Sequence, residues 1–187
     1  MSIALVFAIS LFGISFASWQ IISTQETTNT VVTGCFDVLF TPGTNINRLD
    51  IDYPISDVTG QATTPYTFTV KNNCTGPTAL NVSYVLRLDI LSTSTMPENK
   101  TKGYLTKGAG TVVKGPALLS NTGSFPTITI ADAGYKSTAY TLDTGTLAAN
   151  ASVTYNLRLW IDESAIIAET SGTTFSARVT VVSTATT

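Results

Sequence analysis

The side chains that usually carry out chemistry are scarce in this sequence, and they form no familiar catalytic pattern. The chain contains no histidine, which removes the commonest general base, the usual base of a serine-hydrolase triad and the usual zinc ligand. Serines are numerous, but none lies beside an obvious activating base. The sequence therefore predicts a protein that is not an enzyme and that needs no cofactor.

Three carboxylates lie close together, at Asp50, Asp52 and Asp57. A hard cation such as calcium uses oxygen ligands at such a spacing. Alternate aspartates are equally typical of the outward face of a strand, and no glycine-punctuated ligand loop accompanies them. Pairs of acids suited to glycoside hydrolysis arise by chance among 12 acidic residues. We therefore predict no metal site and no carboxylate-based active site.

The two cysteines, Cys35 and Cys74, have neither CxxC spacing nor a histidine neighbour. If the chain is exported to an oxidising compartment, one disulfide between them is the natural interpretation. Such a bond would close a loop of about 40 residues, which the chain-entropy model associates with roughly 4 kcal/mol. The alternative is two independent thiols.

The composition argues against nucleic acid as a partner. Charged residues make up only 12% of the chain, and the net charge is −2, so there is no basic surface to hold a phosphate backbone. The 187 residues suffice for one domain with a sizeable core and an N-terminal targeting segment.

Alternation of apolar and polar residues is the strongest structural signal. The stretch from Thr64 to Ile90 is expected to form two strands joined by a polar loop that carries Cys74. A second alternating stretch, Ala151 to Ile161, directs its apolar residues inward. Trp160 falls on the opposite, polar side, so it is either a sheet-edge aromatic or a contact patch.

Further strands and one short helix are expected along the rest of the chain. The predicted strands share high β propensity and flanking turn signals, and they are Cys35–Phe40, Leu49–Tyr53, Phe125–Ala131, Ser137–Leu142 and Thr174–Ser183. A hairpin is expected between Tyr104 and Val113, and a short helix from Asp162 to Glu169 with Asp162 as its N-cap. Eight or so short strands with almost no helix predict an all-β, two-sheet β-sandwich.

The N-terminal stretch has a different character from the rest. Residues 3–22 are mostly apolar, enough to span a bilayer as a helix. Ser15-Phe16-Ala17 also supplies a signal-peptidase pattern. Either element normally begins with Lys or Arg, whereas this one begins with Met1-Ser2, so we expect an upstream start or a trimmed chain. The predicted organisation is a signal peptide or membrane anchor (1–22), a polar linker or donor strand (23–33) and one β-sandwich domain (34–187). The alternative for residues 1–22 is a buried helix of the globular domain.

Four Asn-x-Ser/Thr sequons occur, at Asn73, Asn81, Asn99 and Asn150. Most are expected by chance in a chain so rich in Asn and Thr. Asn99, in a predicted exposed loop, is the first candidate for glycosylation.

Several segments together resemble the TasA/camelysin-like family of secreted β-sandwich proteins of Gram-positive bacteria, which has related subunits in archaeal filaments. The resemblance is carried by the apolar leader ending in Ser15-Phe16-Ala17-Ser18-Trp19, by Gly34-Cys35-Phe36-Asp37-Val38, by Tyr66-Thr67-Phe68-Thr69-Val70-Lys71-Asn72 and by Ser152 to Trp160. It implies a jelly-roll domain whose freed N-terminal segment adds as a strand to the next subunit. The protease activity attached to the camelysin name is not expected, because the chain has no zinc motif.

Applied to this chain, the resemblance implies a donor segment from Ser18 to Val32, with Trp19, Ile21, Ile22, Val31 and Val32 as its apolar residues. The expected function is an exported structural protein, a cell-surface or extracellular filament or biofilm-matrix subunit. Its partners would be copies of itself, and the membrane before processing. The alternative is a monomeric, membrane-tethered adhesin or ligand-binding domain.

Overall fold

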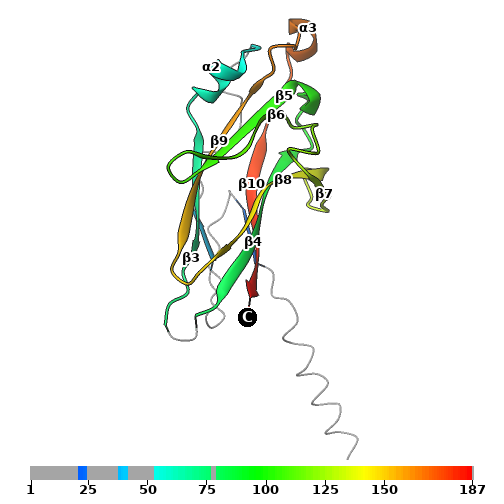
Figure 1. The fold of residues 1–187 in the computed structure, drawn as a ribbon. Coiled ribbons are helices and arrows are strands. Elements are labelled where there is room, and N and C mark those ends of the chain that lie inside the picture. The colour runs from blue at the N-terminus through cyan, green and yellow to red at the C-terminus, as the bar shows by residue number, and fades with distance from the viewer. Residues whose placement is uncertain (1–20, 25–37, 42–52, 77–78, 187) are drawn as a thin grey trace, which may run out of the picture.

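A computed structural model describes residues 21–24, 38–41, 53–76 and 79–186 of the chain. Two five-stranded antiparallel sheets pack face to face (Figure 1). The first, the β4 sheet, has the order β1-β10-β4-β8-β7, and the second, the β9 sheet, has the order β2-β3-β9-β5-β6. The prediction of an all-β, two-sheet sandwich is confirmed.

The strands of the β4 sheet are β1 (Ile21–Thr24), β4 (Asn81–Leu91), β7 (Thr127–Thr129), β8 (Tyr135–Leu147) and β10 (Ala177–Thr186). Those of the β9 sheet are β2 (Val38–Thr41), β3 (Tyr66–Asn72), β5 (Thr101–Lys107), β6 (Thr111–Leu118) and β9 (Ser152–Ile161). The order β1-β10-β4-β8 opposite β3-β9-β5-β6 is that of a jelly roll.

Three short helices complete the described chain: α2 (Asp57–Gln61), η1 (Glu98–Lys100) and α3 (Ile167–Thr170). Helices α2 and α3 lie at one end of the sandwich, and the C-terminus lies at the other (Figure 1). We call the end that carries α2 and α3 the helical end, and the opposite one the terminal end. The terminal end holds the described residues that follow β3 (73–76) and precede β4 (79–80), and the loop 148–151 that connects β8 to β9.

The two alternating strands expected within Thr64 to Ile90 are confirmed as β3 and β4. They belong to different sheets, so the loop that carries Cys74 crosses from one layer of the sandwich to the other. The side chains predicted to face inward on β4 are buried from Val82 to Ile90. They meet Phe68, Val70, Tyr155 and Leu157 of the β9 sheet in one continuous core, which supplies most of the folding free energy.

Other predicted elements differ in their bounds. The last strand begins at Ala177 and ends at Thr186, although Phe175, Ala177, Val179 and Val181 are buried as expected. The helix expected from Asp162 is wrong in extent, because it covers only Ile167–Thr170. Asp162 instead accepts a hydrogen bond from the backbone N–H of Ser164 at 2.9 Å, so it stabilises a tight turn after β9.

Candidate functional site

The two lateral sides of the sandwich differ in how their sheet edges are finished. On one side, both edge strands are shorter than the strands they pair with. Strand β1 has four residues and pairs with the ten-residue β10, and β2 has four residues and pairs with the seven-residue β3. The register of β1 joins Ile21 to Ser183 and Thr24 to Thr180. A short strand on a long neighbour makes few ladder hydrogen bonds, so another strand can readily replace β1, as it can the three-residue β7 at the other edge of the β4 sheet.

On the other lateral side, the β6 edge of the β9 sheet is protected against strand addition. Strand β6 carries Lys114 and Pro116, and its pairing with β5 is interrupted by two register shifts. Proline has no backbone N–H to donate to an added strand. Bulges, lysine and proline are usual means of blocking edge-to-edge association, and neither lysine nor proline occurs in β1 or β2, so their side is the candidate assembly edge.

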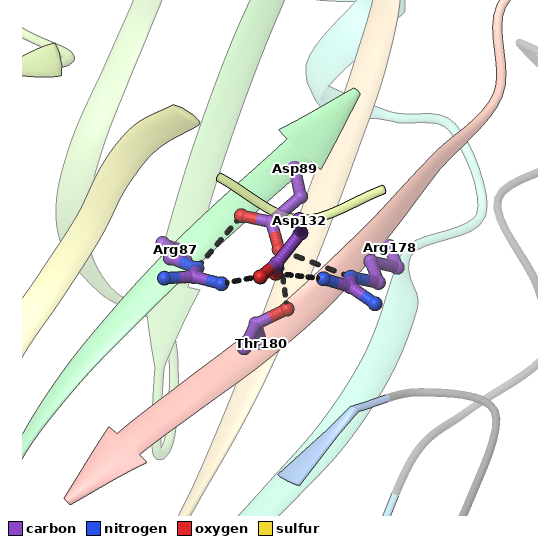
Figure 2. A network of polar contacts seen from close by, with 5 residues as sticks. All are labelled: Arg87, Asp89, Asp132, Arg178 and Thr180. Carbon is purple, nitrogen blue, oxygen red and sulfur yellow. Dashed lines mark hydrogen bonds and ion pairs between the residues drawn. The ribbon is translucent and has the colours of Figure 1, made fainter. Parts of the chain in front are cut away.

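A buried charge network lies on the outer face of the β4 sheet (Figure 2). The Oδ1 of Asp89 lies 2.8 Å from Nε of Arg87, and its Oδ2 lies 3.0 Å from Nε of Arg178. Thr180 donates its hydroxyl to the same Oδ2 at 2.7 Å. Both arginines also pair with Asp132, which lies in the connection between β7 and β8. The ring of Tyr135 stacks on the Arg178 guanidinium at 3.7 Å.

This network corrects part of the sequence interpretation. Arg87 and Asp89 lie on the face of β4 opposite the core, as the alternation predicts, but they are buried rather than exposed to solvent. Two arginines and two aspartates balance in charge, and every carboxylate is paired. The arrangement holds the connection between β7 and β8 on the sheet, and it offers no unpaired group for catalysis.

A second polar cluster links the two sheets through the core. The hydroxyls of Tyr84 (β4) and Tyr155 (β9) lie 2.6 Å apart, and Tyr155 donates to Oδ2 of Asp143 at 2.7 Å. Lys107 pairs with the same oxygen at 3.2 Å. Burial raises the pKa of both tyrosines, and the hydrogen bonds to Tyr84 and Asp143 raise that of Tyr155 further. Both phenols therefore stay neutral at physiological pH and serve as hydrogen-bond bridges.

Trp160 is not a surface contact, so the predicted contact patch is wrong. The side chain points away from the core, as predicted, but it is completely buried because helix α2 lies on it. A Cβ placed on Gly60 of that helix would come within 2.3 Å of two indole atoms. The sequence shows which face of β9 carries Trp160, but only the path of the chain around α2 shows that this face is covered.

Ion pairs join α2 to the neighbouring strands beside Trp160. Lys102 lies 2.7 Å from both Asp57 and Asp162. Burial by itself would lower the pKa of Lys102, but its hydrogen bonds to Asp162 and Asp57 outweigh this and raise the pKa. Burial would likewise raise the pKa of Asp162, yet the hydrogen bonds from Lys102 and Ser164 lower it. Asp57, one of the three calcium candidates, is thus engaged by a lysine.

The remaining predicted site residues are placed as follows. Ile21 and Ile22 belong to β1, whereas Trp19, Val31, Val32, Cys35, Asp50 and Asp52 lie outside the described residues. Cys74 is buried in the loop after β3. Among the residues that the structure describes, no cluster of metal-ligating side chains occurs. Asn73, Asn81, Asn99 and Asn150 are all exposed.

A shallow open hollow of about 410 Å³ lies over β4, β8 and β10. It is lined by hydroxyls and small apolar groups, chiefly those of Ser83, Thr144, Thr146, Thr184, Val85 and Val182. Hydroxyls without a neighbouring base are poor nucleophiles, so the residues that line this hollow supply no activated nucleophile.

Comparison with known proteins places no constraint on these interpretations. No family model matches the chain, and no curated protein matches it. Within the described ranges, no helix has both the length and the apolar character needed to cross a membrane.

Proposed function

We propose that this protein is an exported, non-enzymatic structural subunit that assembles into filaments at the cell surface or outside the cell. Assembly occurs when β1 of one copy adds to β10 of another. The observation that carries the proposal is the contrast between two sheet edges: β6 is blocked against strand addition by its proline, lysine and register shifts, whereas within the described residues β10 is covered by four residues of β1. The resemblance to TasA/camelysin-like proteins agrees with this function.

Strand exchange of this kind needs no new chemistry. A β1 strand from another copy would take the register seen within one chain, with Ile22 opposite Val182 and Ser23 opposite Val181. The same backbone hydrogen bonds would form, so the exchanged and unexchanged forms differ little in local energy. The balance is then decided by protein concentration and by contacts between the copies.

Two features of the sequence support export. Residues 2–25 carry no charged side chain, and Ser15-Phe16-Ala17 offers a cleavage pattern. Cleavage near Ala17 would leave Ile21 and Ile22 close to a free N-terminus, where a donor strand must lie.

The predicted disulfide also fits export. Strand β2 begins three residues after Cys35, and β3 ends two residues before Cys74. Val38 pairs with Asn72, so in sequence Cys35 precedes β2 and Cys74 follows β3 at the same end of this strand pair. A bond between them would hold β2 on β3 while β1 stays exchangeable.

An engineered cross-link tests strand exchange directly. In antiparallel strands, opposite residues have Cβ atoms about 4.5–5.5 Å apart, near the separation of a disulfide. The double variant Ile22→Cys/Val182→Cys should give isolated monomers when it is oxidised before assembly. Oxidation after assembly should instead give a ladder of covalent multimers on a non-reducing gel. The two single variants are the matched controls.

A ladder that never appears, at any protein concentration, would refute assembly by β1. Electron microscopy of the same samples shows whether the multimers are filaments. Mass spectrometry of the exported protein then locates its N-terminus. An intact Met1–Ile22 segment in the membrane fraction would favour the membrane-tethered alternative instead.

A further inference from the structure

Four asparagines of the chain belong to Asn-x-Ser/Thr sequons, and the structure places all four at the surface. Asn73, Asn81, Asn99 and Asn150 are exposed, whereas the neighbouring Asn72, which belongs to no sequon, is completely buried. An N-linked glycan is bulky and hydrated, so its asparagine must face solvent. Exposure of the asparagine therefore permits glycosylation at each sequon but does not choose among them.

The hydroxyl residue of each sequon separates the four. The motif requires the Ser or Thr hydroxyl as well as the Asn amide, so a transferase that acts on the folded chain must reach both groups. Thr101, the hydroxyl residue that follows Asn99, is completely buried. Its hydroxyl donates to the backbone carbonyl of Pro97 at 3.0 Å. Asn99, the first candidate by sequence, thus lacks an accessible hydroxyl in the folded chain.

The first two sequons along the chain are also held by the fold. Ser83 of the second one lies within β4, which pairs with β10 on one side and β8 on the other, and its hydroxyl lies 3.4 Å from that of Thr146. Cys74 of the first one is buried, and its backbone N–H donates to the side-chain oxygen of Asn72 at 3.1 Å. A transferase would have to break these contacts to engage either sequon.

The sequon of Asn150 meets both requirements. Asn150 and Ser152 are both exposed, and Ser152 is the first residue of β9. Asn150 lies in the turn between β8 and β9, which is closed by a hydrogen bond from the N–H of Ala151 to the carbonyl of Ala148 at 3.0 Å. Its φ of 58° falls in the left-handed region, which asparagine tolerates well. The turn by itself explains the asparagine, but it does not explain the exposed hydroxyl two residues later.

The Asn150 turn lies at the end of the sandwich where the described chain enters its first strand. Ile21, the first residue of β1, pairs with Ser183 near the end of β10. Leu147, the last residue of β8, lies level with Ala185 in the same sheet, because both pair with the same residue of β4. The start of β1 and the Asn150 turn therefore both lie at the terminal end.

Asn99 lies at the opposite end of the molecule. It belongs to η1, whose Lys100 pairs with Glu169 of α3 at the helical end. Strand β4 runs between the two ends with eleven residues, a length of about 35 Å. In the proposed export, the apolar segment before Ile21 is expected to hold the chain at the membrane until it is cleaved. A saccharide donor anchored in that membrane would meet the terminal end first.

We propose that Asn150 is the preferred site of N-linked glycosylation on the folded chain, with an oligosaccharide carried on a lipid phosphate as the donor. The Nδ2 atom of Asn150 forms a bond to the anomeric carbon of the saccharide, and the bond from that carbon to the phosphate oxygen breaks. The lipid phosphate leaves, and the amide proton passes to a base of the transferase. This inference rests on the proposed export, since the donor lies at the membrane, but it does not rest on strand exchange.

Peptide mass spectrometry of the protein purified from the cells that make it tests the assignment. Trypsin releases Asn150 within residues 137–158 and Asn99 within residues 88–100, so the two sites are measured on separate peptides. The first peptide should carry a saccharide mass, and the second should be unmodified. An unmodified 137–158 peptide would overturn the proposal, and so would equal occupancy of the two peptides.

Substitutions at Ser152 separate glycosylation from the structural role of the turn. Ser152→Ala leaves Asn150 and its turn in place but removes the required hydroxyl, so the added mass should disappear. Ser152→Thr restores a hydroxyl and should retain the added mass. The matched control is Asn99→Gln, which removes an exposed sequon at the other end and should leave the 137–158 peptide unchanged. A saccharide that persists in Ser152→Ala would overturn the assignment to this sequon.

The cross-linking assay of the Ile22→Cys/Val182→Cys variant keeps this inference distinguishable from the proposed function. A covalent ladder from protein whose Asn150 carries no saccharide would overturn glycosylation alone. A glycosylated Asn150 in protein that never forms a ladder would overturn strand exchange alone. Unmodified protein that is found only inside the cell would overturn both export and glycosylation.

Discussion

Two segments cover the outer faces of the two sheets, and they are held in opposite ways. The connection between β7 and β8 lies on the β4 sheet through the buried charges of Asp89, Arg87, Arg178 and Asp132 (Figure 2). Helix α2 lies on the β9 sheet through the close approach of Gly60 to Trp160, with Lys102 at its margin. Attachment of the β7–β8 connection depends on charge balance, and attachment of α2 depends on shape, so the stability of the two segments should respond to different substitutions.

The largest effect is expected from Asp89→Ala. This change removes the carboxylate that two arginines and Thr180 share, and it leaves buried positive charge without its main partner. Breaking a buried ion pair from one side typically costs about 3–5 kcal/mol. Urea unfolding should show a loss of this size in the free energy of unfolding.

The matched control for that change is Thr180→Val. It removes one hydroxyl from the same cluster but keeps the charge balance, so a loss of about 1 kcal/mol is expected. Equal losses for the two variants would show that charge balance is not what holds the connection between β7 and β8.

A smaller loss in the free energy of unfolding is expected from Gly60→Val in helix α2. The new side chain would collide with the indole of Trp160, and overpacking of this kind costs about 1–3 kcal/mol. Adding Trp160→Leu should recover part of the loss, because the smaller side chain makes room. Strictly additive losses in a double-mutant cycle would contradict the contact between α2 and Trp160.

Acid should weaken the attachment of helix α2 to the β9 sheet, because Asp162 takes part in the ion pairs beside this helix. Its pKa is lowered in the folded protein by hydrogen bonds from Lys102 and Ser164, which outweigh its burial. A group with a lowered folded pKa contributes stability above its unfolded pKa, and this contribution is lost as the pH falls below about 4. Urea midpoints measured across this range should show the parent and Asp162→Asn converging at low pH. A difference that stays constant with pH would refute this role of Asp162.

The smallest effect is expected from Glu169→Gln. Lys100 and the backbone N–H of Ile166 lower the pKa of Glu169 through hydrogen bonds, but the carboxylate lies at the surface, where ion pairs contribute little. The urea midpoint should stay within experimental error of the parent value. A shift as large as that of Gly60→Val would show that α3 is held mainly by charge.

The strands themselves were predictable because their signal is local. Val82, Leu86 and Leu88 recur at every second or fourth position, and a strand places such residues on one face. The same reasoning placed Trp160 on the outer face of β9. The sequence also predicts no catalytic constellation, because the chain has no histidine and its serines lie beside no obvious activating base; this stays a prediction.

The buried charge network was not predictable in this way. Arg178 meets Asp89 across 89 positions of sequence, and Arg87 meets Asp132 across 45. Alternation indicates which face of β4 carries Arg87 and Asp89, but not which strand lies beside it or which loop covers it. The same limit applied to Trp160, whose burial depends on the position of helix α2.

The sequence by itself determined the all-β class and the inward face of each long strand, because a period of two follows from strand geometry alone. The tertiary structure decided which outward-facing side chains are buried and which sheet edges are covered. These depend on strand order and register, and both are set by contacts between residues far apart in the chain. The pairing of the four-residue β1 with the longer β10 is one of these features, and the proposed assembly rests on it.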